Sequence, residues 1–464
     1  MTVRRMVHLA ARLPGDGRDA VRTDPRSGPR TAFASLEQPA RTAERGLFDF
    51  LLLSERLRLP EHRGRIHDLD AVGWPETVTV LNALAAVTER LGLAATAHTA
   101  FTEPYELARR LATLDHLSEG RAAWHVETTA DAFTGANFRP GPRTGARDRY
   151  AHAVEFIGLA RRLWDSWTAD GLSRPFAHQG RYFDIAGEFG LPRPPQRHPV
   201  VILSGETEED REAAASSADV LLVRHRSVAA GRALAADLGR RLAGYGRAAG
   251  DLKIMCGVGV VLGDTAAEAQ ERAVEIRRQQ ISPQGALFVL ERVWGTDLSG
   301  LDPDGSLPET DPVPDPVLDP VPDPLPDFVP DPLLDLVPDS VPDPVPDPAT
   351  APGRMRHGDR LALAGTWRAL AKEKGLSIRE TVIEASGRQS FIGTPDTVAA
   401  ALQAYVREGA ADGFVLLPHR TPGCLDEFVD RVVPLLQERG AFRTEYRGTT
   451  LRSHLGLPDP AGEG

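Results

Sequence analysis

Residues 48–55 read FDFLLLSE, a run of apolar residues that ends on two polar side chains. A strand covered on both faces by helices has such a continuous apolar run, whereas a strand with one solvated face alternates apolar and polar residues. Residues 220–223, VLLV, have the same character. Both stretches therefore predict parallel strands in the interior of an α/β fold.

Working outward, eight stretches of this kind alternate with amphipathic helical segments along the 464-residue chain. The predicted strands are Met6–Ala10, Phe48–Glu55, Gly92–Thr99, Arg121–Thr128, Pro199–Gly205, Ala218–His225, Lys253–Leu262 and Asp412–His419. The clearest predicted helices are Glu76–Arg90, Pro104–Leu117, Arg149–Trp167, Thr207–Ser217, Val228–Ala249, Thr265–Gln280 and Pro395–Glu408. Eight strand–helix units favour a (β/α)8 TIM barrel, α/β in class, over a doubly wound sheet, and no GxGxxG or GxxxxGK[ST] motif is present. We expect one barrel domain over residues 1–464.

Two connections are longer than a barrel needs. Residues 130–198 follow the fourth predicted strand and contain an extra helix and an aromatic- and proline-rich stretch. Residues 281–393 follow the seventh strand and contain the predicted helix Asp359–Glu373. Because the βα loops of a barrel emerge at its active-site face, both insertions are predicted to be substrate lids.

The second insertion includes a low-complexity repeat at residues 311–348, with Asp at every fourth position and no Lys, Arg or Glu. Its prolines exclude a helix or an interior strand, so we expect a disordered or polyproline II segment. A tolerated insertion is the simplest interpretation, and a partner- or calcium-binding role is the alternative. The ten aspartates leave a net charge of −1 on the other 426 residues, from −11 for the whole chain, so net charge says little about partners of the folded part.

The cysteine count and the apolar runs indicate the compartment. Cys256 and Cys424 are the only cysteines, and they match neither a disulfide framework nor zinc-finger spacing. No apolar run approaches the roughly 18–20 residues that cross a bilayer. The N-terminal apolar stretch is broken by His8 and Arg12 before a signal-peptide core forms. We expect a cytoplasmic protein with no membrane or nucleic-acid partner.

Polar side chains gather at the predicted strand ends, where a barrel places its active site. Five of these residues are histidines, namely His8, His98, His125, His225 and His419. One histidine at a strand end is usually structural, but several on one rim favour a functional site. A metal centre with Glu55 or Glu127 as further ligands is an alternative, although no HxH or HxxxH spacing occurs at these ends.

The turn after the fifth predicted strand, LSGETEEDREAA at residues 203–214, has the outline of a phosphate cradle. Gly205 permits close approach of the backbone, and a helix N-terminus offers free amide groups. Its acidic residues oppose this role, because they suit the helix dipole and repel a phosphate dianion. Ordinary helix capping by Thr207 is therefore the other interpretation. The acidic residues are Glu206, Glu208, Glu209 and Asp210.

Longer stretches resemble a known family. They are residues 44–55, 91–129, 149–167, 391–402, 412–419 and 428–457. These are similar to the flavin-dependent family of nitrilotriacetate monooxygenase component A, the pristinamycin IIA synthase large subunit and dibenzothiophene-sulfone monooxygenase, within the bacterial luciferase-like superfamily. The resemblance covers the chain except for the Asp–Pro repeat. It implies a luciferase-like TIM barrel, commonly a homodimer, that takes reduced FMN (FMNH2) from a separate flavin reductase and uses O2 to oxygenate a small-molecule substrate.

The resemblance also implies site residues. His125 would face the flavin as the catalytic residue, and the implied flavin-binding residues are Glu55, His98, Thr99, His125, Tyr150, Gly205, Glu206 and Thr207. No metal is implied.

Several of these positions depart from the family pattern. Ser54-Glu55 stands for Ala-Asp, His125 stands for Asn, and Ala146 stands for the histidine four residues before the retained tyrosine. In the turn, Glu206 and Asp210 replace small residues, although Arg149 and Arg211 could compensate their charge. Two alternatives therefore stay open: a flavin-deficient paralogue acting as a binding or scaffold subunit, and a deazaflavin-dependent oxidoreductase on the same barrel.

Overall fold

The computed structural model describes most of the chain. The described residues are 5–13, 31–55, 57, 61–62, 65–66, 75–128, 137–138, 146–168, 171–224, 227–313, 357–385, 390–420 and 423–460. Most of the Asp–Pro repeat, residues 314–348, and the predicted rim residue His225 lie outside them. The expectation for the repeat therefore stays a prediction.

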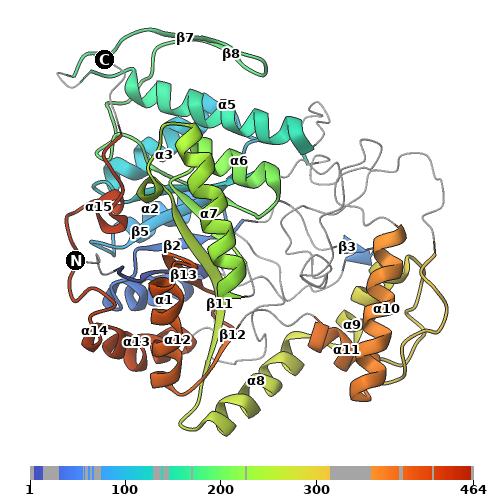
Figure 1. The fold of residues 1–464 in the computed structure, drawn as a ribbon. Coiled ribbons are helices and arrows are strands. Elements are labelled where there is room, and N and C mark those ends of the chain that lie inside the picture. Colours follow the sequence, from blue (N-terminus) through green and yellow to red (C-terminus); the bar gives the residue numbers. More distant parts are fainter. Residues whose placement is uncertain are drawn as a thin grey trace.

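Eight parallel strands close into a barrel (Figure 1). In order around the barrel they are β1 (His8–Leu13), β2 (Phe50–Leu53), β5 (Gly92–His98), β6 (Ala122–Glu127), β9 (Val200–Ser204), β10 (Val220–Val223), β11 (Lys253–Leu262) and β13 (Gly413–Leu416). The ring is closed by β13 beside β1, with His8 opposite Gly413, and by β11 beside β10, with Lys253 opposite Val220. The predicted TIM barrel is confirmed.

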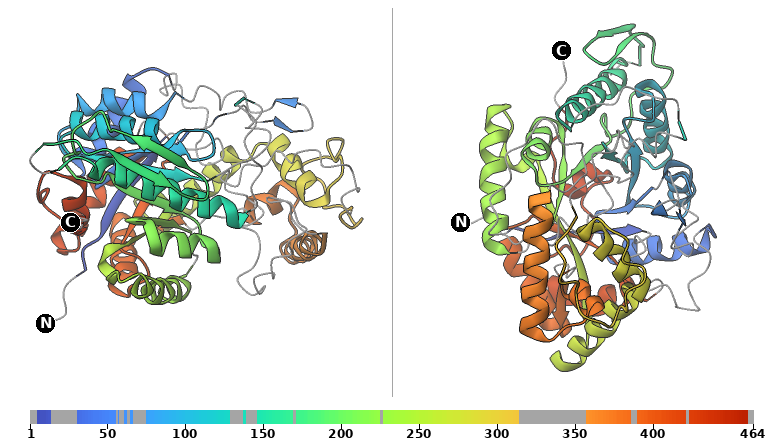
Figure 2. Two further views of the ribbon diagram at one scale, coloured as in Figure 1. Left: turned by 90° about the horizontal axis from the view of Figure 1, so that it is seen from above. Right: turned by 90° about the vertical axis from the view of Figure 1, so that its right-hand side faces the viewer.

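Helices surround these strands, as the two views of Figure 2 show. The outer helices are α1 (Ala34–Arg45), α2 (Thr77–Ala85), α3 (Pro104–Leu117), α5 (Ala146–Asp165), α6 (Glu208–Ser217), α7 (Val228–Gly244), α12 (Pro395–Arg407), α13 (Cys424–Arg431) and α14 (Val433–Glu438), with a 3-10 turn at Ala249–Asp251 after α7. Their starts follow the predicted capping chemistry: the side chains of Thr207 and Thr394 accept N–H groups of the first turns of α6 and α12.

The first strand lies later in the sequence than predicted. β1 runs over His8–Leu13, not Met6–Ala10, because the chain keeps its extended pairing with β2 through Arg12 despite that residue's charge. His8 is therefore the first residue of the strand, at the N-terminal end of the barrel. The prediction that His8 belongs to the polar rim at the strand ends is wrong.

The barrel interior has an apolar layer that is closed at its N-terminal end. The inward-facing residues of this layer are Ala10, Phe50, Leu52, Ala94, Ala123, Val200, Ile202, Val220, Met255 and Val415. Leu451 and Leu455 of the C-terminal helix α15 (Leu451–Leu455), together with Leu457, belong to the same cluster. The C-terminal segment therefore covers the N-terminal ends of the strands.

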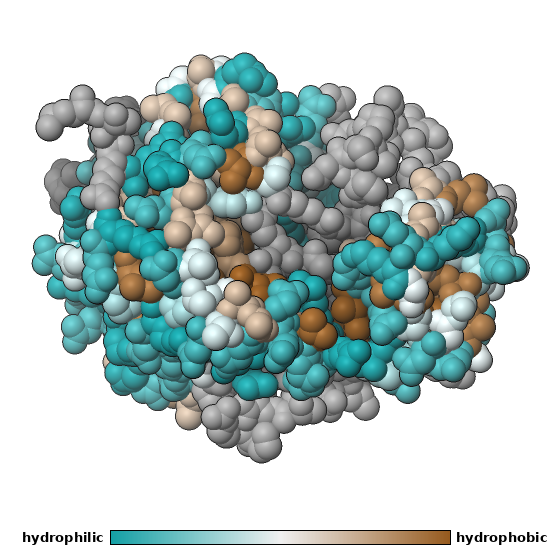
Figure 3. Space-filling model, turned by 60° about the horizontal axis from the view of Figure 1, so that its bottom comes forward, coloured by the Kyte–Doolittle hydropathy of each residue, from teal (hydrophilic) through white to brown (hydrophobic). Residues whose placement is uncertain are grey.

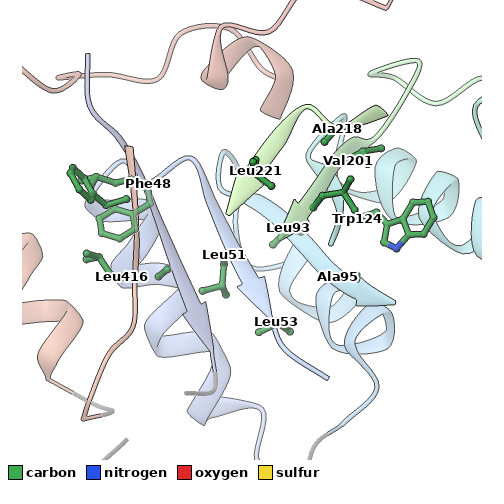
Figure 4. Packing of buried hydrophobic residues seen from close by; sticks show 14 of the residues in the cluster. Phe48, Leu51, Leu53, Leu93, Ala95, Trp124, Val201, Ala218, Leu221 and Leu416 are labelled. Carbon is green, nitrogen blue, oxygen red and sulfur yellow. The ribbon is translucent and has the colours of Figure 1, made fainter. Parts of the chain in front are cut away.

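A second and larger apolar cluster joins the strands to the surrounding helices. Figure 4 shows part of it, including Leu51 of β2, Leu93 of β5 and Trp124 of β6. Because side chains alternate across a strand, these residues face outward while their neighbours face the barrel interior. This alternation fixes which residues line the inside of the barrel.

The insertion after β11 forms a helical unit beside the barrel, to the right in Figure 1, and it appears as a separate lobe in Figure 3. It contains α9 (Pro283–Trp294), α10 (His357–Lys374) and α11 (Ile378–Ala385), and α8 (Ala266–Gln280) leads into it. The unit has a core of its own around Trp294 and Trp367. The chain returns through a strand that was not predicted, β12 (Ser390–Gly393), which pairs with the second half of β11.

The insertion after β6 differs from the prediction. Its helix, α5, packs between α3 and α6, so it takes the place of the fourth outer helix of the barrel and is not an extra element. The added element is an antiparallel hairpin of β7 (Phe176–Gln179) and β8 (Asp184–Gly187). A second small hairpin, β3 (Glu61–His62) with β4 (Arg65–Ile66), follows β2. Whether either insertion acts as a lid stays a prediction.

Within the described part of the chain, no helix has both the length and the apolar character required to span a membrane.

Candidate active site

A polar layer lies above the apolar layer inside the barrel. Every second residue of a barrel strand faces the interior. On five neighbouring strands, the inward position that follows the apolar layer is polar, and it lies within the strand or directly after it. These positions are Arg12, Ser54, Thr96, His125 and Ser204. They lie toward the C-terminal ends of the strands, where barrels carry their active sites.

His125 is held in this layer by two hydroxyl groups. Its Nδ1 lies 3.1 Å from Thr96 Oγ1, and its Nε2 lies 2.6 Å from Ser204 Oγ. The Thr96 hydroxyl donates its single hydrogen to the carbonyl of Leu53 at 2.7 Å. Nδ1 must therefore carry the proton that it shares with Thr96, which leaves Nε2 to accept the hydrogen of Ser204.

The imidazole of His125 is neutral at physiological pH. Burial, together with the nearby Arg12 and His98, lowers its pKa from 6.5 to about 3. His125 therefore acts as a fixed hydrogen-bonding group and not as an imidazolium. Ser204, as the donor to Nε2, keeps its own oxygen lone pairs as acceptors.

Arg12 and Glu55 place two more polar groups at this end. Arg12 Nε donates to Ser54 Oγ at 2.5 Å, on the strand next to its own. Burial, together with the carboxylate of Glu76, raises the pKa of Glu55 from 4.5 to about 7. Glu76 is fixed because its side chain caps α2 through the N–H groups of Val78 and Thr79. Glu55 is thus partly protonated near neutral pH.

The other predicted rim residues are distributed around this layer. His98 ends β5 and is buried, with its ring centroid 6.0 Å from that of Phe101. Thr99 is buried too, and its N–H donates to the Glu127 carbonyl at 3.0 Å. His419 lies beyond β13 with Nδ1 3.4 Å from Cys424 Sγ. For His98 and Thr99, contact with a cofactor stays a prediction.

The remaining predicted residues meet at the turn between β9 and α6. Tyr150 OH donates to Asp210 Oδ1, and Asp210 Oδ2 accepts Thr207 N at 2.9 Å and Thr207 Oγ1 at 2.8 Å. Asp210 N donates back to Thr207 Oγ1 at 3.2 Å, so the two residues form a capping box. Capping by Thr207 is confirmed, with the carboxylate of Asp210 turned inward and buried.

Gly205 makes room for that carboxylate. Its φ of +122° lies in a region that favours glycine. A Cβ at this position would lie 2.2 Å from Asp210 Oδ2, so any larger residue would displace the carboxylate. Glu206 is turned elsewhere and accepts the N–H of Arg224 at the end of β10.

The turn therefore does not fit a phosphate group. The hydroxyl of Tyr150 and both donors of Thr207 are directed at the carboxylate of Asp210. Burial raises the pKa of Asp210, while the hydrogen bonds from Tyr150 and Thr207 oppose that shift and favour the carboxylate; burial also raises the pKa of Tyr150. An anion of the chain itself occupies the position where the resemblance places the phosphate of FMN.

Sequence reasoning missed four residues that shape the site: Arg12, Thr96, Ser204 and, as an inward-facing group, Asp210. The two-residue period along the predicted strands could have identified Thr96 and Ser204 from their apolar neighbours. Arg12 was missed because the first predicted strand ended at Ala10. The T-x-x-D pattern of a capping box is the sequence signal for the pairing of Asp210 with Thr207.

The described residues also bear on the metal alternative. Among them, no three side chains of His, Cys, Asp and Glu form a group that could hold a metal ion.

Comparisons with known proteins place the chain in a family. A family model described as luciferase-like monooxygenase matches residues 18–412. The chain is 35% identical over 446 residues to nitrilotriacetate monooxygenase component A of Aminobacter aminovorans, covering 90% of this chain and 89% of that protein. It is 31% identical over 483 residues to N-acetyl-S-(2-succino)cysteine monooxygenase of Bacillus subtilis, covering 98% of each.

Solved structures agree with the sequence relatives. The EDTA monooxygenase of Chelativorans sp. BNC1 superposes with a TM-score of 0.73 at 25% identity, over 98% of this chain and 99% of that one. A structure from Hyphomicrobium sulfonivorans, DmoA, gives a TM-score of 0.73 at 26% identity, over 97% of this chain and 92% of that one. The similarity extends over both the barrel and its insertions.

Proposed function

Because this chain belongs to the luciferase-like monooxygenase family, we propose that it uses O2 and a reduced flavin, supplied by a separate flavin reductase, to oxygenate a small organic molecule. The designation of one relative as component A supports a system of two proteins. A reduced flavin supplies the electrons that activate O2, while the protein supplies binding, orientation and exclusion of water.

One observation carries this proposal: His125 is fixed as a neutral, Nδ1-protonated imidazole between Thr96 and Ser204 at the C-terminal end of the barrel. These two contacts use both ring nitrogens of His125, so the imidazole keeps one orientation and fixes Ser204 Oγ, which can accept a hydrogen bond from a heterocycle. Glu55, with its pKa near 7, can hold a proton at the same end of the barrel.

The insertion after β11 supports a closed reaction site. Helices α9 to α11 form a unit with its own core beside the barrel, and Figure 3 shows apolar side chains near the junction of the two. Luciferase-type chemistry needs water kept away from the reacting groups, and an insertion at the βα face is suited to provide that exclusion.

The test is oxygen transfer from labelled O2. The purified protein is supplied with a generic flavin reductase, NADH and 18O2, and offered nitrilotriacetate and dibenzothiophene sulfone, the compounds named for its relatives. We expect 18O in a product of at least one member of an enlarged panel of such compounds. His125→Ala should lower product formation about a hundredfold or more, and the distant Lys374→Ala should leave it unchanged. Equal product formation by the His125 variant would contradict the assignment of the site.

A further inference from the structure

We propose that the site takes a flavin whose side chain ends in a hydroxyl group, as in riboflavin, in preference to one that ends in a phosphate. The inference rests on the proposed function and identifies the cofactor class that this site accepts. It follows from the carboxylate of Asp210, which occupies the anion position at the N-terminus of α6.

The position of the turn makes it the place for a ligand side chain. α6 begins four residues after Ser204, whose hydroxyl contacts His125 in the polar layer. Gly205, the residue next to Ser204, opens the backbone at this point. A ring held against His125 and Ser204 would therefore extend its side chain toward the same turn.

Three donors around the turn are already used by the chain. Tyr150 OH, Thr207 N and Thr207 Oγ1 all donate to Asp210, whose side chain is buried. These are the kinds of donor that bind a phosphate at a helix N-terminus, and here they bind an internal carboxylate. A phosphate would have to displace the Asp210 carboxylate from these donors or bind beside it.

The charge at the turn also disfavours a phosphate. Two unit negative charges about 4 Å apart repel by roughly 1–4 kcal/mol at the dielectric of a protein surface, which is about a tenfold to thousandfold loss of affinity. Arg149 lies in the field of Glu127 as well as that of Asp210, so its charge is shared between two carboxylates. Arg211 is engaged with Asp237, 3.4 Å away.

A hydroxyl group, in contrast, can use the acceptor position that remains on Asp210. An ionised carboxylate has about four acceptor positions on its two oxygens. Among the described residues, Asp210 Oδ2 accepts two hydrogens from Thr207 and Oδ1 accepts one from Tyr150. Oδ1 thus keeps an acceptor position that a terminal ribityl hydroxyl can use and that a phosphate dianion, which has no hydrogen to donate, cannot.

The experiment compares riboflavin with FMN on the same protein. Both are titrated as oxidised flavins by fluorescence quenching and as reduced flavins under anaerobic conditions. We expect riboflavin to bind at least about tenfold more tightly than FMN. Equal or tighter binding of FMN would overturn this inference and leave the proposed function intact, whereas binding of neither flavin would overturn both.

Two variants at Asp210 and one control locate the cause. Asp210→Ser removes the carboxylate and keeps a short capping side chain, and it should raise FMN affinity about tenfold or more while riboflavin gains nothing. Asp210→Asn keeps the shape of the side chain without its charge and should shift the preference in the same direction. It replaces Asp210→Ser in the experiment if the serine variant folds poorly. Glu208→Ser removes an equal charge from the same helical turn, but that side chain is 78% exposed, so its effect should stay within about threefold. Equal effects of the Asp210 and Glu208 variants on FMN affinity would show that the overall negative charge of the turn matters, and not the Asp210 carboxylate at the anion position.

Discussion

The two ends of the barrel use their buried ionisable groups in opposite ways. At the N-terminal end, Asp49 and Asp219 each lie just before a strand and pair with an arginine from the C-terminal segment. At the C-terminal end, burial moves the pKa values of Glu55 and His125 toward the neutral forms. The first end is fixed by charge pairs, and at the second Glu55 and His125 are held as neutral hydrogen-bonding groups beside the proposed site.

The charge pairs of the N-terminal end are accompanied by backbone contacts. Asp49 Oδ2 accepts Leu9 N at 2.9 Å, while Asp219 Oδ2 accepts Val201 N, also at 2.9 Å. Arg452 of α15 places its guanidinium 3.1 and 3.2 Å from the two oxygens of Asp219. Each carboxylate thus joins a strand start to a neighbouring strand and to the C-terminal segment. The ion pairs Asp49–Arg443 and Asp219–Arg452 thus hold the N-terminal end of the barrel together, while the polar layer around His125 lies toward the other end of the strands.

The largest effect is expected from removing one cation at the N-terminal end. Arg452→Ala leaves the buried carboxylate of Asp219 with Arg161, at 3.8 Å, as its remaining ion-pair partner among the described residues. We expect a loss of about 3–5 kcal/mol in the free energy of unfolding, measured by urea denaturation. Lys374→Ala, which breaks an exposed pair with Glu384, should cost less than about 1 kcal/mol. Similar losses in the two variants would contradict the structural role of the buried pair.

A cavity made at the N-terminal end of the barrel tests whether the stability of that end is independent of flavin binding at the C-terminal end. Leu455 is fully buried in the cluster that closes the barrel, so Leu455→Ala should cost about 2–4 kcal/mol in unfolding free energy. Flavin affinity should change by less than about twofold, because the cavity lies at the other end of the strands. Leu172→Ala, at a position 62% exposed, is the control for stability. A large loss of flavin affinity in Leu455→Ala would show that the two ends are coupled.

Acid pH should weaken the N-terminal end. Burial alone would raise the pKa of Asp49, but Arg443 and His8 outweigh it and bring the value down from 3.8 to about 2. Since the folded-state pKa is the lower one, this stabilisation is present above about pH 4 and is lost as pH falls through about 2. It amounts to about 2 kcal/mol. Asp49→Asn, less stable overall, should lack this part of the pH dependence, and an unchanged slope between pH 4 and 2 would argue against the pairing.

Glu55 should show the opposite and smaller dependence. Burial, aided by Glu76, raises its pKa from 4.5 to about 7, so the folded state binds the proton more tightly than the unfolded state. Stability should therefore fall as pH rises from about 4.5 to 7, by on the order of 1 kcal/mol because the group is partly exposed. The variant Glu55→Gln should not show this fall. A wild-type stability that rises across that range relative to the variant would place Glu55 in a different environment.

Local pattern was enough to predict the barrel. The strand Lys253–Leu262 and the helix Pro104–Leu117 have the predicted bounds, because each is a long periodic segment with clear ends. β12 was not predicted, since its four residues are too few to carry a period. The closure by α15 was also beyond local pattern, because Arg452 of this helix and its partner Asp219 are 233 residues apart.

The site was predictable in part for the same reason. His125 lies near the end of a recognisable apolar strand, so its place near the barrel rim follows from the sequence. Whether Asp210 faces solvent or turns into the fold depends on Tyr150, 60 residues away, and on the space above Gly205. The sequence shows the acidic turn, but only the packed structure shows that one of its carboxylates fills the cradle.

The central claim is that the polar layer around His125 is the flavin site. A crystal structure of the protein soaked with riboflavin tests it most directly. The account predicts the isoalloxazine ring within about 4 Å of His125 and Ser204, with its side chain directed to Asp210. A flavin bound elsewhere on the chain, with this layer filled only by water, would contradict it.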